Sequence, residues 1–258
     1  MPSNVSRLGP VPGTPQASPR DAIGVLGGLG PHAGLDLVRA ILDETAARRD
    51  QDHLPVVLVS VPGRIPDRSA WIADRSAPSP VPPMAEVLRQ LDAAGCAVAG
   101  VPCNTAHAPV LFDALRETMA QENRPIRLVH IVDAIVAHAR EVAPEAETIG
   151  VLATDSSVEN RLHRLGLEAA GLGAVVPDAE HQRAVQASIF DPVWGLKAQA
   201  SPPDPRAREA LLGATAHLAA RGAEAVILGC TELPLAVPGA AHAATGLPFI
   251  SSTRALAR

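Results

Sequence analysis

The sequence predicts an α/β protein made of two pseudo-symmetric domains, each with a parallel sheet, and a functional site in the cleft between them. Short apolar runs alternate with longer segments of helical period, which is typical of parallel strands covered by helices on both faces. Strand patterns from the first half of the chain recur in the second half. Hydrophobic residues make up 47% of the chain and aromatic residues 2%, so an aliphatic core is expected.

The elements are predicted in chain order. Residues 1–20 are rich in Pro, Ser and Gly and lack the apolar stretch of a signal peptide, which predicts a disordered leader. A buried strand is expected at 22–26, a glycine-rich turn at 27–31 and a helix at 33–48. The later expected strands are 54–61, 97–101, 126–131, 149–152, 225–228 and 248–250, and the later helices are 85–94, 106–119, 133–142 and 206–220.

Two repeated patterns divide the chain into halves. Residues 95–103 read GCAVAGVPC and residues 222–230 read GAEAVILGC, while IGVL occurs at both 23–26 and 149–152. The separations within the two pairs agree to within one residue, which indicates a duplicated α/β unit. An N-terminal domain over 21–129, completed by 251–258, and a C-terminal domain over 130–250 are therefore expected.

The repeat places two cysteines at equivalent positions. Cys103 and Cys230 each end a buried strand, before a polar turn that opens a helix, where parallel sheets bind ligands. A helix N-terminus lowers the pKa of a thiol and attracts carboxylates. Two thiols that approach one carbon from opposite sides can remove a proton from one face and return one to the other, which is racemisation or epimerisation. Cys96 has no counterpart in the repeat and is expected to be a small buried hydrophobe.

Several motifs resemble one enzyme family. The segments are IGVLGGLGPHA (23–33), RRDQDH (48–53), IPDRS (65–69), VPCNTAH (101–107) and LGCTEL (228–233). Together they are similar to the cofactor-independent aspartate/glutamate racemase superfamily, and within it to the aspartate racemases. The resemblance implies two α/β domains with the site between them, a homodimer, an amino-acid substrate, and neither pyridoxal phosphate nor a metal.

The resemblance also implies roles for individual residues. Cys103 and Cys230 would be the catalytic pair, and Arg68 would hold the side-chain carboxylate of the substrate. Arg183 follows Gln182 where the family has a lysine. The other predicted substrate-binding residues are Leu29, Asn104, Thr105, Ser157 and Thr231, with His107 and Glu232 in supporting roles.

The chain departs from the family pattern at a few positions. Ser60 and Val61 stand where the family often has two asparagines, Ser157 where it has a threonine, and Ser251 where it commonly has an aspartate. Since both cysteines are kept, these departures bear on the substrate more than on the chemistry.

Two other site types fit the motifs less well. Gly28, Gly30 and Ala33 match a dinucleotide-binding loop, but the second strand is not closed by the acidic residue that this site uses. Cys103 and His107, with Cys230 and Glu232, could supply metal ligands, but a metal would neutralise both thiolates that proton transfer needs. No cofactor and no metal are therefore expected.

Composition limits the partners. The net charge of −5 gives no basic footprint for nucleic acid, and no apolar run reaches the roughly 20 residues of a membrane helix. A soluble, cytoplasmic protein is expected. Besides an amino-acid racemase or epimerase, most favoured for aspartate, two readings stay open. One is a related dicarboxylate isomerase or lyase, for example on maleate, and the other is a non-catalytic amino-acid-binding relative.

Overall fold

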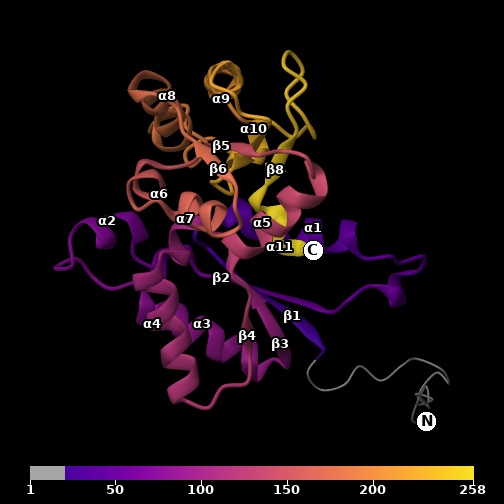
Figure 1. Cartoon of the computed structure of the whole chain (residues 1–258). Coiled ribbons are helices and arrows are strands. Elements are labelled where there is room, and N and C mark those ends of the chain that lie inside the picture. The colour runs from indigo at the N-terminus through magenta and orange to yellow at the C-terminus, as the bar shows by residue number, and fades with distance from the viewer. Residues whose placement is uncertain (1–20) are drawn as a thin grey trace, which may run out of the picture.

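The computed structural model describes residues 21–258 and contains two four-stranded parallel sheets (Figure 1). The first sheet has the order β2-β1-β3-β4, with β1 (Ala22–Gly27), β2 (Val56–Ser60), β3 (Cys96–Gly100) and β4 (Arg127–Leu128). The second has the order β6-β5-β7-β8, with β5 (Thr148–Leu152), β6 (Gly173–Val175), β7 (Ala225–Leu228) and β8 (Phe249–Ser251). The matching strand orders confirm the predicted fold class. The leader expected over residues 1–20 lies outside the described residues.

The register within each sheet follows the sequence repeat. Gly24 pairs with Ala99 between β1 and β3, and Gly150 pairs with Val226 between β5 and β7. The second pair is the counterpart of the first in the repeated patterns. The duplication therefore extends from sequence to strand pairing, and it places the ends of β3 and β7 at equivalent points.

Helices and short 3-10 turns connect the strands. The helices before β5 are α1 (Pro31–Glu44), α2 (Arg68–Ala73), α3 (Val81–Ala93), α4 (Pro109–Gln121) and α5 (Ile131–Val142). The later ones are α6 (Asp155–Glu159), α7 (Leu162–Ala169), α8 (Ala179–Phe190), α9 (Pro205–Ala220), α10 (Leu233–Ala236) and α11 (Ser252–Ala257). The 3-10 turns are η1 (Asp50–Asp52), η2 (Pro62–Arg64) and η3 (Asn104–His107). Proline lies in the first turn of α1, α3, α4 and α9, where a backbone N–H has no partner within the helix.

Some predicted elements needed correction. The helix expected at 106–119 is divided into η3 and α4, because Ala108 is extended before Pro109. The strand expected at 126–131 shrinks to the two residues of β4, because α5 already begins at Ile131. Helices α2, α6, α7, α8 and α11 and strand β6 were not predicted.

The core is aliphatic, and the two halves share part of it. One buried cluster joins Val25 and Leu37 of the first half to Ile131, Ile149 and Leu256. In Figure 1, α11 follows the second sheet in sequence but lies beside α1 and α5, between the two sheets. The domain limits given above stay a prediction, and this cluster is where the expected domains meet.

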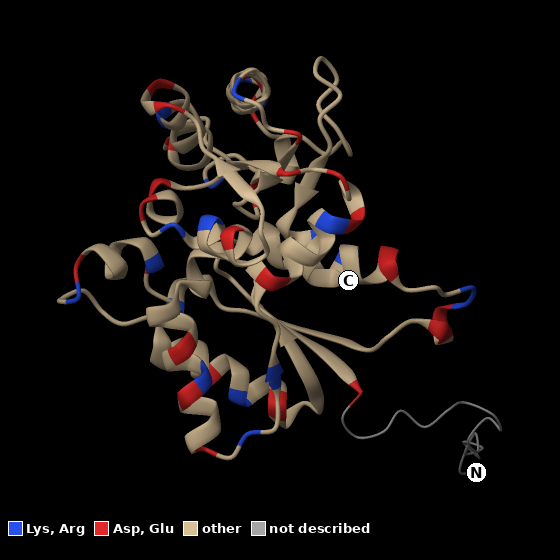
Figure 2. Cartoon of the chain, in the orientation of Figure 1, with Lys and Arg blue, Asp and Glu red and all other residues tan. Residues whose placement is uncertain are grey.

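Charged residues lie mainly on helices and loops (Figure 2). Within the eight described strands, Arg127 is the only charged residue. Across residues 21–258, no helix has both the length and the apolar character needed to cross a membrane.

Candidate active site

Cys103 and Cys230 line the same small cavity. Each follows the end of its strand, β3 or β7, and the cavity has a volume of about 20 Å³. Its lining residues are Leu29, Asp67, Arg68, Ser69, Cys103, Asn104, Thr105, Thr154, Phe190, Lys197, Gly229, Cys230, Thr231 and Glu232. Three larger cavities, of about 410, 1060 and 450 Å³, are lined by none of the predicted site residues within 21–258.

The cavity is narrow. Its volume is roughly what one water molecule needs, which is less than an amino acid occupies. The two cysteine loops are joined by one hydrogen bond, which the Thr231 hydroxyl donates to the Pro102 carbonyl at 3.1 Å.

Cys230 lies beside a carboxylate. Its thiol donates to Oε2 of Glu232 at 3.0 Å, and the Lys197 ammonium donates to Oε1 of the same carboxylate at 3.0 Å. Burial raises the pKa of Cys230 well above its ordinary value, the Glu232 charge raises it further, and Lys197 opposes both. The general expectation that a helix N-terminus lowers the thiol pKa is wrong here, because burial and the carboxylate outweigh the short α10. Cys230 is held as a protonated thiol.

Cys103 lies beside a cation instead. The Arg68 guanidinium is anchored to the glycine turn, where Nη2 donates to the Leu29 carbonyl at 2.9 Å. Burial alone would lower the pKa of Arg68, but its interactions with Cys103, Asp67 and Glu232 together raise it. Among the described residues its Nε–H has no hydrogen-bond partner although it is buried. Arg68 thus offers positive charge to Cys103 and keeps a free donor at the cavity.

Asn104 is fixed by partners from two helices. Its Nδ2 donates to the Ser252 hydroxyl of α11 at 3.1 Å, and its Oδ1 lies 3.0 Å from Nε2 of His163 on α7. Burial lowers the pKa of His163 to about 4, so the ring is neutral at neutral pH. Because the amide oxygen can only accept, Nε2 carries the proton and donates it. The amide that follows Cys103 is therefore oriented by the second half of the chain.

His107 supports the loop from behind. Its Nδ1 lies 3.0 Å from the Cys103 carbonyl oxygen, which can only accept, so Nδ1 is the donor. Burial lowers the pKa of His107 to about 3, and the ring stacks on Phe112 with centroids 4.7 Å apart. The neutral ring holds the Cys103 backbone in place.

The glycine turn serves close packing. Gly28 has a φ of +88°, and a Cβ there would lie 2.8 Å from the backbone nitrogens of Val61 and Pro62. A Cβ at Gly30 would overlap Oε1 of Glu232. The turn thus touches the carboxylate that holds the Cys230 proton, which gives the glycines a role without a dinucleotide.

Two predicted residues lie elsewhere. Arg183 is exposed on α8 and lies outside the cavity lining, so its assignment to the substrate stays a prediction. Its neighbour Gln182 faces inward and donates to the Ala153 carbonyl at 3.0 Å, and successive helix positions cannot share a face. Ser157 is one layer behind the cavity, where its hydroxyl accepts from Thr154 at 3.1 Å.

Lys197 is a cation of the cavity lining that was not predicted from the sequence. It lies in the loop between α8 and α9, and its side chain is 29% exposed. Burial lowers the pKa of Lys197, but Glu232, Cys230 and Cys103 together raise it above its ordinary value. One signal was available: it is the only lysine among 22 basic residues. Phe190 and Thr154 also line the cavity and lie outside every recognised motif, whereas Asp67 and Ser69 belong to IPDRS and were given no role.

Known proteins share this architecture. The chain superposes on the aspartate racemase of Picrophilus torridus with a TM-score of 0.74 at 25% identity, over 92% of this chain and 91% of the other. An aspartate racemase homologue from Pyrococcus horikoshii OT3 shares the fold (TM-score 0.69, 20% identity, 92% and 96% covered). So does a glutamate racemase from Bacillus anthracis (TM-score 0.61, 18% identity, 93% and 80% covered). A sequence model described as Asp/Glu/Hydantoin racemase matches residues 26–258. With nearly its whole length matched, the chain belongs to the Asp/Glu/hydantoin racemase family.

Proposed function

We propose that this protein is a cofactor-independent aspartate racemase in which Cys103 and Cys230 are the acid and base. The observation that carries the proposal is that two cysteines from equivalent repeat positions line one cavity together with two cations, Arg68 and Lys197. The likeness to the Picrophilus torridus aspartate racemase supports aspartate as the substrate.

The proposed reaction moves one proton at each face of the α-carbon. The thiolate of one cysteine takes the α-hydrogen as a proton, so an S–H bond forms while the Cα–H bond breaks, and the electron pair is delocalised into the α-carboxylate. The thiol of the other cysteine then loses its proton to the opposite face of the carbon. Nothing is oxidised or reduced, and the thiol and thiolate have exchanged places.

The surroundings of the sulfurs favour one starting arrangement. Glu232 accepts a hydrogen bond from the Cys230 thiol, while Arg68 places positive charge next to Cys103. We therefore assign the base to Cys103 and the acid to Cys230 in the free enzyme. The enantiomer produced by this turnover reacts in reverse with the exchanged arrangement.

Cations in the cavity support a dicarboxylic substrate. Among residues 21–258 the Nε–H of Arg68 has no hydrogen-bond partner. In this proposal it donates a charge-assisted hydrogen bond to the side-chain carboxylate of the substrate. In this proposal Lys197 adds a second positive charge, the turns at Asn104, Thr105 and Thr231 surround the α-carboxylate and amino group, and Leu29 shapes the cavity. A neutral amino acid would leave the Arg68 N–H donor without an acceptor, which is costly.

The test is a chiral assay of the purified protein against a panel of L-amino acids in D₂O, without added cofactor. We expect D-aspartate to accumulate and deuterium to enter the α-position, with L-alanine and L-serine nearly inert. Formation of an unsaturated dicarboxylate from aspartate, or isomerisation of maleate, would identify the related lyase or isomerase instead. Binding of aspartate without α-exchange would identify a non-catalytic relative.

A further inference from the structure

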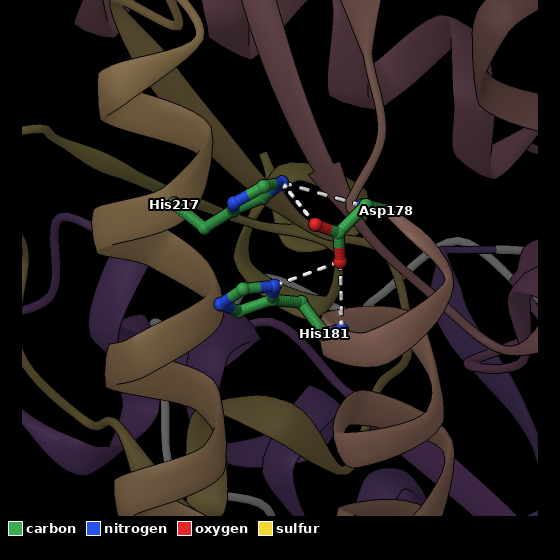
Figure 3. Close-up of side chains that lie close together, drawn as sticks. All are labelled: Asp178, His181 and His217. Atoms are coloured by element: carbon green, nitrogen blue, oxygen red, sulfur yellow. Dashed lines mark hydrogen bonds and ion pairs between the residues drawn. The ribbon is translucent and has the colours of Figure 1, made fainter.

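A cluster of two histidines and one aspartate lies away from the cysteines, on α8 and α9. Asp178 caps the N-terminus of α8, His181 lies in its first turn, and His217 comes from the facing α9 (Figure 3). One nitrogen of each ring and a carboxylate oxygen all lie within 4.8 Å of one another. Within residues 21–258, this is the only group of three or more His, Cys, Asp or Glu side chains with such spacing.

The Asp178 carboxylate is positioned so that one oxygen can coordinate a cation. Oδ1 of Asp178 accepts from the His181 backbone N–H at 2.9 Å, which is the helix cap, and lies 2.8 Å from Nδ1 of the His181 ring. The backbone and ring hydrogen bonds from His181 hold the Asp178 carboxylate in place. Its second oxygen, Oδ2, faces Nε2 of His217 at 3.6 Å and is free to coordinate without loss of the cap.

The imidazole nitrogens lie close enough to share one ion after the side chains rotate. Nε2 of His217 accepts from the backbone N–H of Asp178 at 3.3 Å, and coordination would replace this hydrogen bond. The two rings stack with centroids 4.0 Å apart and planes 16° apart, so at least one ring must rotate before both in-plane lone pairs meet at a single ion. On coordination Nδ1 of His181 would exchange its hydrogen bond to Asp178 for a bond to the ion.

We propose that Asp178, His181 and His217 bind a divalent transition-metal ion of the zinc class, with water completing the coordination. Imidazole nitrogens with one carboxylate suit such ions, whereas calcium and magnesium prefer oxygen ligands alone. All three side chains are partly exposed, so an ion can reach them. The ion joins the start of α8 to α9, and the loop between these helices carries Lys197.

The experiment is a zinc titration of the EDTA-treated protein, made without a histidine tag and carrying Cys103→Ala and Cys230→Ala so that active-site thiols cannot compete. Calorimetry should give one ion per chain, and cobalt should give the visible absorption of a site with nitrogen and oxygen ligands. His181→Ala and His217→Ala should each weaken zinc binding by roughly 100-fold.

The matched control is His53→Ala, which removes an exposed histidine outside the cluster and should leave binding unchanged. Circular dichroism of each variant shows whether it is folded. Saturation that is the same in the His217→Ala variant, or absence of saturation below millimolar zinc in the folded parent protein, would overturn the proposal.

Discussion

The two cysteine sites have the same backbone position and opposite electrostatic surroundings. Cys103 follows β3 and lies beside the Arg68 guanidinium, whereas Cys230 follows β7 and its thiol donates a hydrogen bond to Glu232. Strand register places both residues by the same rule, but the neighbouring charges are not repeated, because Glu232 stands at the position equivalent to Thr105 and Arg68 begins α2. Duplication therefore supplies two sulfurs in equivalent places, and residues that the repeat does not share give them different electrostatic surroundings.

This difference has a limit set by thermodynamics. The equilibrium constant of racemisation is unity, so kcat/KM must be equal in the two directions at every pH. The free enzyme has two forms, one with the proton on Cys103 and one with it on Cys230. If one form is favoured, kcat and KM can therefore differ between the two enantiomers only by the same factor. The enantiomer that needs the less populated form should show the higher KM and a proportionally higher kcat.

The largest expected effect comes from removal of either sulfur. Cys103→Ala and Cys230→Ala should each lower racemisation by about 1000-fold or more, because no group remains to serve one face of the carbon. Each variant should still exchange the α-hydrogen of one enantiomer with D₂O, and the two variants should exchange opposite enantiomers. NMR of L- and D-aspartate in D₂O measures this.

The difference between the two cysteine sites also predicts which single variant exchanges the α-hydrogen faster. Cys230→Ala leaves the sulfur beside Arg68 and should exchange faster at neutral pH than Cys103→Ala, which leaves the protonated thiol. Cys96→Ala, at a buried cysteine outside the cavity, is the control and should keep full racemisation. Exchange of the same enantiomer by both single variants would end the idea of opposed faces.

Two substitutions of Arg68 should distinguish the effect of its positive charge from the effect of its planar guanidinium group. Arg68→Lys keeps a cation near Cys103 but loses the planar fork, so kcat/KM for aspartate should fall by about 30- to 1000-fold with a much smaller loss for neutral amino acids. Arg68→Met removes the charge as well and should slow every substrate. Steady-state rates for aspartate and alanine give the ratio, and an equal loss for both substrates in Arg68→Lys would make the arginine structural.

Glu232→Gln should make the two cysteine sites more alike. The Glu232 charge contributes to the raised pKa of Cys230, so its removal lowers that pKa. Activity requires one protonated sulfur and is lost as pH rises through the upper pKa of the pair, so the alkaline limb should move to lower pH, equally in both directions. At neutral pH the rate should fall roughly 100-fold. An unmoved alkaline limb would show that Glu232 does not hold the Cys230 proton.

The smallest effect is expected from the glycine turn. Gly30→Ala places a methyl group against Oε1 of Glu232 and should displace that carboxylate, which lowers activity roughly 10-fold. Gly63→Ala is the control, because no described atom lies within 4 Å of the added Cβ. Equal activity of both variants would show that the carboxylate tolerates displacement.

Much of the first-order architecture follows from local sequence. Strand β7 coincides with its prediction at 225–228, since a short run of Ala, Val, Ile and Leu between two glycine-containing turns allows few alternatives. The two cysteines and Asn104 lie at one cavity because each belongs to a motif at a strand end, and Arg68 lines the same cavity from the first residue of α2. Ser251, a departure from the family pattern, caps α11 through its hydroxyl, which accepts from the Arg254 N–H, as an aspartate would.

The parts that sequence could not supply depend on tertiary packing. Lys197 reaches Glu232 from a loop with no periodic pattern, and only the packing of α8 on α9 determines where that loop lies. Strand β6 has three residues and is not fully buried, so it carries no distinct apolar run. Asp178 and His181 face His217 for the same reason, across a helix pair of which only α9 was predicted. The homodimer expected from the resemblance stays a prediction.

The position of α11 has a consequence for how the chain folds during synthesis. This helix buries Ala255 and Leu256 against α1 and α5, yet it is translated after the entire second sheet. At ordinary translation rates, roughly 10 s pass between the emergence of β4 and that of α11. During that interval the apolar face of α1, including Leu37 and Ile41, lacks one of its native partners. The first half is therefore exposed to chaperones and proteases until the second half has been made, and slower translation of the later segment should increase its loss.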